Sequence, residues 1–353
     1  MNTGGSSMNI DAFLVEAKER NASDVHLSVN APVMYRVNGE LEPQGEPLSP
    51  DDLDAMARSM MNAEQWGRFL ERGEIDFSYS IRGVSRYRVN AYRQRGCISV
   101  AARLIPARIP TLDELGLPRV FRTFMEKPHG LVLVTGPTGS GKSTSLAALL
   151  DAINQTQRRH IITLEDPIEY LHTHKMSIVD QREIGLDTLG FAPALRAALR
   201  QDPDILLVGE MRDLETISTA ITASETGHLV FATLHTSDAV QTVERIIDVF
   251  PAEQQGQIRL QIASVLQGVV SQRLHRSADG RYRAASFEVL VNTPAVANLI
   301  RTGKTHQIPS LMQTGRQFGM QTMEMSIQEL VQQGKIAASV LKQWTSSTQL
   351  AGW

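Results

Sequence analysis

The chain has 353 residues, of which 42% are hydrophobic and 21% are charged, with a formal net charge of −3. This length favours two domains, and the composition is that of a globular protein with ample material for a core. The charge gives no general attraction to nucleic acid or acidic lipid, and no apolar run reaches the about 18 residues that span a membrane. The single cysteine, Cys97, excludes a disulfide framework and a four-cysteine zinc site, and it suits a reducing cytoplasm.

The N-terminal part predicts a leader followed by a small α+β domain. Residues 1–7 read as a disordered leader. The start "MNTGGSSM" is not a secretory signal, because it lacks the basic and apolar regions of one. Residues 8–105 then mix the two periodicities of a domain with helices and strands. Ser49 and Pro50 mark a helix start, and Asn38-Gly39 marks a hairpin turn. Helical spacing covers 9–22, and strand alternation covers 24–29, 33–43, 76–81 and 85–94.

A change of pattern predicts the second domain. Three prolines within residues 106–118 indicate a linker between the domains. From 119 to 293, continuous apolar runs alternate with helical stretches, which predicts a mostly parallel sheet covered on both faces, and so an α/β fold. The remaining residues, 294–353, are helical by pattern. The apolar runs are 131–136, 161–166, 205–210 and 228–234.

The segment 136–143 matches the phosphate-binding pattern GxxxxGK[ST]. Its glycines let backbone N–H groups point at phosphate oxygens, and the positive end of the following helix adds to the attraction. Lys142 is expected to reach the β- and γ-phosphates, and the hydroxyl of Ser143 to ligate Mg²⁺. We therefore predict a site for ATP and Mg²⁺ formed by Gly136, Pro137, Thr138, Gly139, Ser140, Gly141, Lys142, Ser143 and Thr144.

Hydrolysis also requires an acid near the metal and a base for water. Glu210 follows the apolar strand 205–208, one residue later than the acid of the usual P-loop pattern, and is predicted on the metal side. A solvated loop acid is the alternative for this residue. Asp204, at the other end of the same strand, is expected to lie far from the phosphates.

Three acids cluster where another apolar run, 161–166, ends, and there they would meet the phosphates at the carboxyl edge of the sheet. Glu165 is the candidate for activating water, whereas Asp166, before Pro167, is placed like a helix N-cap. Glu169 completes the cluster. A metal or an arginine is needed to offset the repulsion among these charges.

Two histidines, His228 and His235, flank the last apolar run. Their separation of seven puts them on opposite faces of an ideal strand, which argues against a shared metal. His235 is a candidate for sensing the γ-phosphate, and His228 reads as a residue that starts the strand. Residues 172–175, "HTHK", read as a solvated loop.

Seven arginines and no acid occupy residues 82–108. Three interpretations remain open from composition alone. In the first, the arginines bind nucleic acid, with Tyr87 and Tyr92 as stacking partners. In the second, they form a solvated strand face. In the third, they reach the phosphates of another protomer as arginine fingers.

Together these features resemble the secretion ATPases, and within them the type IV pilus retraction ATPases, the PilT family. The similarity extends from Met8 to about residue 343. It rests on "ASDVHLS", "RYRVNAYRQRG", "GPTGSGKST", "LEDPIEY", "QREIG", "RQDPDILLVGEMRDLETI", "TGHLVFATLHT", "LQGVVSQRL" and "GKTHQI…GMQTM", in this order.

The resemblance implies a PAS-like N-terminal domain and a RecA-like ATPase core with a helical C-terminal region. It implies Glu165 as the catalytic acid, Glu210 as the Walker B acid, and His228 and His235 as histidine-box residues at the nucleotide. It also implies Arg88 and Arg103 as the arginines that reach nucleotide, which favours the third interpretation above.

The implied function is a hexameric, ATP-hydrolysing motor for pilus retraction. Its partners would be five copies of itself, an inner-membrane platform protein and other pilus ATPases, at the cytoplasmic face of the membrane. The family segment close to AIRNLIRE reads "AVANLIRTG" here, with Ala297 and Thr302 replacing Arg and Glu. An accessory, PilU-like role or another secretion ATPase is therefore an alternative. A nucleic-acid translocase is disfavoured by the acidic net charge, and no stable nucleic-acid binding is expected.

Overall fold

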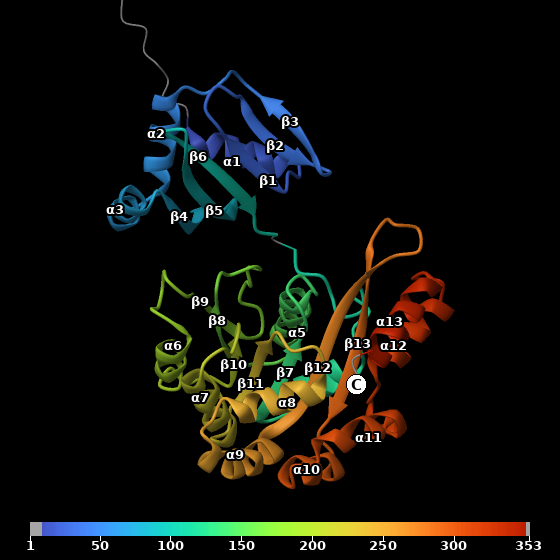
Figure 1. Cartoon of the computed structure of the whole chain (residues 1–353). Coiled ribbons are helices and arrows are strands. Elements are labelled where there is room, and N and C mark those ends of the chain that lie inside the picture. Colours follow the sequence, from blue (N-terminus) through green and yellow to red (C-terminus); the bar gives the residue numbers. More distant parts are fainter. Residues whose placement is uncertain (1–8, 107, 351–353) are drawn as a thin grey trace, which may run out of the picture. The chain divides into compact units, whose positions relative to one another are not determined.

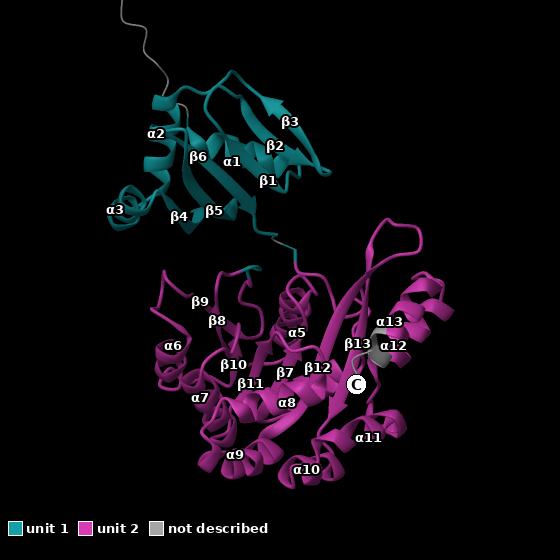
Figure 2. Ribbon diagram, viewed as in Figure 1, with its two compact units in different colours: residues 1–108, 169–171 teal, residues 109–168, 172–353 magenta. Residues whose placement is uncertain are grey.

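The computed structural model describes residues 9–106 and 108–350, so the predicted leader, residues 1–7, lies outside the described part of the chain. The chain divides into two compact units (Figure 2). Unit 1 takes its residues from 1–108 and 169–171, and unit 2 takes its residues from 109–168 and 172–353. Each unit has a hydrophobic core of its own.

Unit 1 is an antiparallel sheet with helices packed on one face (Figure 1). The strand order is β3-β2-β1-β6-β5-β4, and every pairing is antiparallel. Alternate strand residues and the apolar sides of the helices share one core, which leaves the other face of the sheet polar. The elements are α1 (Ile10–Glu19), β1 (Asp24–Leu27), β2 (Val33–Val37), β3 (Glu40–Gln44), α2 (Pro50–Met60), α3 (Ala63–Arg72), β4 (Glu74–Ile81), β5 (Ser85–Gln94) and β6 (Cys97–Leu104).

Local sequence signals explain the boundaries in unit 1. The β2–β3 hairpin turns at Asn38 and Gly39, whose φ angles of 52° and 92° are positive, as the predicted two-residue turn requires. Helix α2 begins after Ser49, which forms a capping box with Asp52. Both predictions are confirmed.

Unit 2 is a seven-stranded sheet of order β13-β12-β7-β11-β10-β8-β9. All neighbouring strands are parallel except β12 and β13, so the predicted α/β fold with a mostly parallel sheet is confirmed. The elements up to β11 are α4 (Val120–Met125), β7 (Gly130–Thr135), α5 (Lys142–Thr156), β8 (His160–Glu165), β9 (Ile178–Glu183), α6 (Phe191–Ala198), β10 (Ile205–Val208), α7 (Leu214–Glu225) and β11 (Leu229–Leu234). They are followed by α8 (Ala239–Asp248), α9 (Ala252–Val265), β12 (Leu266–Arg276), β13 (Arg283–Val291), α10 (Pro294–Arg301), α11 (Ile308–Thr314), α12 (Met323–Gln332) and α13 (Ala338–Leu350), with short 3-10 turns at Thr305–Gln307 and Arg316–Phe318.

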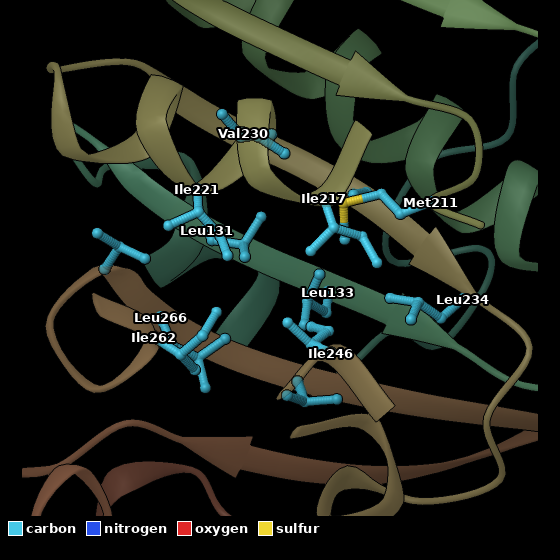
Figure 3. Close-up of a cluster of buried hydrophobic side chains, with 14 of the residues drawn as sticks. Leu131, Leu133, Met211, Ile217, Ile221, Val230, Leu234, Ile246, Ile262 and Leu266 are labelled. Carbon is cyan, nitrogen blue, oxygen red and sulfur yellow. The ribbon is translucent and has the colours of Figure 1, made fainter. Parts of the chain in front are cut away.

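Helices cover both faces of the central strands. On one face, Leu131 and Leu133 of β7 pack with residues of α7, α8 and α9, such as Ile217, Ile246 and Ile262 (Figure 3). On the other face, the alternate β7 residues pack with α4 and α5. Because both faces are buried, these strands read as unbroken apolar runs. Among the described residues, every helix is too short or too polar to span a bilayer.

One local prediction fails after β8, and one strand was not predicted. Asp166 was expected to cap a helix, but residues 166–177 form an irregular segment without one. The strand β9, which pairs with β8 at the edge of the sheet, has no counterpart among the predicted elements. Its exposed positions and its mixture of polar and apolar residues conceal it, because only one face of this edge strand is partly buried.

Candidate active site

The phosphate-binding loop lies between β7 and α5, as its motif predicts. Strand β7 is buried throughout, and the loop turns at Gly136, Gly139 and Gly141, whose φ angles are 141°, 77° and 87°. A Cβ atom on Gly136 would lie 2.3 Å from the carbonyl oxygen of Gln272, so this position has no room for a side chain. The loop is therefore packed directly on the backbone of β12.

Polar groups of the loop are suited to an anion. The Lys142 side chain is buried, and its Nζ donates to the carbonyl oxygens of Gly136 at 2.8 Å and Pro137 at 3.0 Å. Ser140 Oγ is buried and has no hydrogen-bond partner within the described residues. Ser143 and Thr144 are partly exposed in the first turn of α5, where N–H groups and the helix dipole favour negative charge. A buried cation and an unsatisfied hydroxyl at a glycine loop fit a phosphate.

Gln272 of β12 supports this loop, and sequence reasoning missed it. The Ser145 hydroxyl of α5 donates to Gln272 Oε1 at 2.8 Å, and a Cβ on Gly141 would lie 2.8 Å from Gln272 Nε2. The glutamine side chain is 3% exposed. In the sequence, its segment "LQGVVSQRL" carries only the family resemblance, because the contact joins positions more than 120 residues apart.

Glu165 ends β8, and its carboxylate is held from its own strand and from β9. Oε1 accepts hydrogen bonds from Thr163 Oγ1 at 2.6 Å and from Gln181 Nε2 at 3.0 Å. Strands β8, β10, β11 and β7 are parallel and adjacent, so Glu165 lies at the same edge of the sheet as the phosphate-binding loop.

Glu210 and His235 meet at this edge after β10 and β11. His235 Nε2 lies 3.2 Å from Glu210 Oε2, and Arg212 Nε lies 2.8 Å from Glu210 Oε1. The Glu210 side chain is 15% exposed, and the guanidinium of Arg212 offsets its charge in this partly dry position. The sequence did not predict the pairing of Glu210 with His235.

The structure corrects the assignment of His228. Its backbone oxygen accepts from Gly130 N at 3.0 Å, and the next residue, Leu229, pairs with Gly130 at the start of β7. The phosphate-binding loop follows the other end of β7, about 17 Å away along a six-residue strand. Within one chain His228 cannot contact a nucleotide held by that loop; it caps the turn after α7 by bonding to Ala223. Asp204 also lies at this far edge, as predicted, and accepts from His160 N.

The predicted solvated loop at 172–175 is only partly exposed. Burial lowers the pKa of His172 to about 4, and His172 N donates to Gln181 Oε1. The next residues are exposed but are tied to α5 through Asn154.

The two predicted finger arginines belong to unit 1. Arg88 of β5 and Arg103 of β6 are exposed cross-strand partners on the polar face of the sheet. Arg103 Nε donates to Asp24 Oδ1 at 2.8 Å. Burial acts to raise the pKa of the Asp24 carboxyl, but hydrogen bonds from Arg103 and Ser23 outweigh it and hold that pKa below its ordinary value. Arg88 and Arg103 thus present adjacent, exposed guanidinium groups in this chain.

The protein donors near the loop suit a hard cation that binds phosphate oxygens and water. Ser143 and Glu210 supply hydroxyl and carboxylate oxygens, the ligand types that Mg²⁺ prefers. No group of three or more histidine, cysteine or acidic residues able to hold a metal exists among the described residues. A dedicated all-protein metal cage is thus not present in that part of the chain.

Comparison with known proteins agrees with this architecture. The type II/IV secretion system protein family matches residues 6–350. The type IV pilus retraction ATPase PilT of Pseudomonas aeruginosa is 49% identical over 94% of this chain and 96% of its own length. The type IV pilus ATPase PilU of the same organism is 42% identical over 93% of this chain and 86% of its own.

A solved structure matches both units. The crystal structure of the pilus retraction motor PilT with bound ADP has a TM-score of 0.88 and 47% identity, and it covers 95% of this chain and 96% of that one. The predicted order of an N-terminal α+β unit and a P-loop ATPase unit is confirmed by this match. The chain therefore belongs to the type II/IV secretion system protein family and is one of its ATPases.

Proposed function

We propose that this chain is the subunit of a six-membered, ATP-hydrolysing ring that powers the retraction of type IV pili. The observation that supports this most is the gathering of the phosphate-binding loop, Glu165, Glu210 and His235 at the ends of four adjacent parallel strands. This set occurs in a chain that aligns with PilT over nearly its whole length.

ATP is the proposed substrate of this site. The backbone N–H groups of residues 136–141 and the start of α5 would surround the β-phosphate, with Lys142 reaching the β- and γ-phosphates. Ser143 and Glu210 would hold Mg²⁺, which when bound neutralises charge that develops on the phosphate oxygens. Because the protein offers few ligands, the remaining positions around the ion would be filled by phosphate oxygens and water.

The carboxylate of Glu165 is the proposed base for the attacking water. It lies at the same sheet edge as the loop, and its position is fixed by two donors. His235 contacts Glu210 and is placed to register the γ-phosphate through that acid. A change at the γ-phosphate would therefore reach the ends of β10 and β11 through these two residues.

Arg88 and Arg103 would complete the site of a neighbouring subunit. Two adjacent guanidinium groups on an exposed strand face can stabilise the charge of the transferring phosphoryl group, an effect worth about 10³–10⁵ in rate for arginine fingers. The ring would work at the cytoplasmic face of the inner membrane, against a platform protein at the pilus base and alongside other pilus ATPases.

An accessory role, like that of PilU, is the second candidate. It is favoured by one observation: Ala297 and Thr302, in α10 and just after it, replace the Arg and Glu of the retraction-ATPase segment. Ala297 is half-buried and Thr302 is exposed, so the change affects the surface of this helix. Restoration of twitching in cells that lack the main retraction ATPase would support the main role, whereas restoration only beside an active main ATPase would support the accessory role.

The primary test is Mg²⁺-dependent ATP hydrolysis per subunit over a wide range of protein concentration, with oligomer size measured in the same samples. A specific rate that rises as rings form supports a site completed by a neighbour. A constant rate from monomers would rule out the ring mechanism. Well-formed rings without hydrolysis would indicate a nucleotide-gated adaptor or an enzyme that needs its membrane partner.

A further inference from the structure

Oε1 of the Glu165 carboxylate accepts hydrogen bonds from two side chains. Thr163 Oγ1 donates to Oε1 at 2.6 Å, and Gln181 Nε2 donates to the same oxygen at 3.0 Å. Thr163 and Gln181 are direct cross-strand partners in the parallel β8–β9 pair, and Glu165 lies two residues after Thr163 on the same face. The two donors therefore converge on the carboxylate and restrict its rotation.

The orientation of the Gln181 amide is determined by a second bond. The backbone N–H of His172 donates to Gln181 Oε1 at 2.8 Å. A backbone N–H can only donate, so the amide oxygen must face His172 and the amide NH₂ must face Glu165. The same side chain thus joins the carboxylate to the start of the segment 172–177.

That segment is fastened to the helix of the phosphate-binding loop. Asn154 of α5 is fully buried, and it donates through Nδ2 to Thr173 O at 2.7 Å. Its Oδ1 accepts from Lys175 N at 3.1 Å and Ser177 N at 3.3 Å. All three bonds run between α5, which begins at Lys142, and the segment 172–177.

An ion pair reinforces the attachment. Lys175 Nζ lies 2.6 Å from Asp151 Oδ1, and Gln155 Nε2 donates to Asp151 Oδ2 at 2.6 Å. The Asp151 side chain is 11% exposed, so the pair is screened less than a surface pair. A continuous set of contacts therefore leads from α5 through segment 172–177 and Gln181 to Glu165.

We propose that Gln181 is a positioning residue for ATP hydrolysis, which holds the Glu165 carboxylate in register with the phosphate-binding helix. The inference rests on the proposed role of Glu165 as the base. Gln181 does not touch the reacting atoms; it donates to Glu165 Oε1 and so fixes the orientation of the carboxylate. Because its second bond leads back to α5, a shift of that helix would move the base together with the phosphate site.

The test compares two variants of Gln181 in the full-length protein. Gln181→Glu keeps the size and the acceptor for His172 N, but it replaces the donor to Glu165 by a second carboxylate. Gln181→Leu removes both bonds. A positioning role predicts that kcat falls about tenfold to a hundredfold in both, with KM for ATP, ADP affinity and oligomer size unchanged. It also predicts that Gln181→Glu is at least as impaired as Gln181→Leu. A merely structural role predicts the reverse order, because Gln181→Glu preserves the bond to His172.

Asp180→Asn is the matched control on the same strand. Asp180 is largely exposed and pairs with His160, away from Glu165, so kcat is expected to remain that of the wild type. Normal kcat in both Gln181 variants, with Glu165→Gln inactive, would overturn the positioning role and leave the proposed function intact. Loss of ADP binding or of rings together with kcat would show that Gln181 is structural and would also overturn it. An active Glu165→Gln variant would overturn the assigned base and this inference together.

Discussion

The residue most closely tied to nucleotide binding is Lys142, a cation that is only 8% exposed. It rests on carbonyl oxygens of its own loop, in the position from which a lysine reaches phosphate. We expect Lys142→Ala to abolish ATP hydrolysis in a steady-state assay and to weaken ADP binding. Lys304→Ala, at an exposed position remote from the loop, serves as the control. Near-normal hydrolysis by Lys142→Ala would remove the phosphate-binding loop from the mechanism.

His172 makes the fold sensitive to mild acid. Burial lowers its pKa from 6.5 to about 4, so the folded protein binds fewer protons than the unfolded chain in this range. The contribution of the neutral His172 side chain to the free energy of unfolding is fully present above pH 6.5 and is lost as the pH falls towards 4. Between pH 7 and pH 5 we expect a loss of about 1–2 kcal/mol of unfolding free energy from this residue.

Chemical denaturation at both pH values measures this effect. His172→Gln should reduce the difference between pH 7 and pH 5, because a side chain that does not titrate replaces the buried imidazole. His129→Gln, at an exposed position, should leave the difference as in the wild type. An unchanged difference in His172→Gln would mean that the imidazole does not contribute to the acid sensitivity.

At the scale of elements, the phosphate-binding loop depends on its contact with β12. A Cβ on Gly136 would lie 2.3 Å from Gln272 O at a φ of 141°, whereas one on Gly139 would meet nothing within 4 Å at a φ of 77°. Gly136→Ala is expected to lower the unfolding free energy by about 3 kcal/mol, from overpacking and backbone strain together. Gly139→Ala has the strain alone and should cost about 1 kcal/mol. Equal costs in thermal or urea unfolding would contradict the packing argument.

Elements whose signals are local could be predicted from the sequence. The phosphate-binding loop is defined by residues adjacent in the chain, and the buried strands β7, β8, β10 and β11 by runs of apolar residues that both faces require. Helix α2 and the β2–β3 hairpin followed from capping and turn residues in the same way.

What could not be predicted depends on pairing between distant segments. Strand β9 lies at an edge with a mixed pattern, so neither its register with β8 nor the contact of Gln181 with Glu165 is visible in the chain. Gln272 was missed for the same reason, since its bond to Ser145 joins β12 to α5, which are distant in the chain. The distance between His228 and the loop of its own chain could not be predicted either, because a motif gives the order of two residues but not the strand length that separates them.

At the scale of the whole molecule, the proposed ring requires arginines and phosphate-binding loops to come from different subunits. Arg88→Ala should therefore lower the hydrolysis rate of assembled rings by about 10³-fold or more while each subunit still binds ADP. Loss of ADP binding by isolated Arg88→Ala subunits would contradict an action between subunits. Arg95→Ala, at an exposed turn of the same unit, is the control.

Mixing two inactive variants gives a stricter test of sharing. In rings formed from Arg88→Ala and Lys142→Ala subunits, some sites combine an intact loop from the first with an intact arginine from the second. Hydrolysis should therefore return on mixing and should depend on the ratio of the two variants. Mixtures that stay inactive, although mass measurements show that the subunits co-assemble, would place both residues in the same subunit's site.

The packing of the phosphate-binding loop on β12 has a consequence for how a change at the nucleotide site reaches the rest of the sheet. The Gln272 carbonyl lies against Gly136 and its amide lies against Gly141, so both ends of the loop are packed on β12. Strand β12 pairs along its other edge with β13, which leads directly into α10. A displacement of the loop when phosphate binds or leaves is therefore expected to move β12, and through β12 the strand β13 and the helix α10.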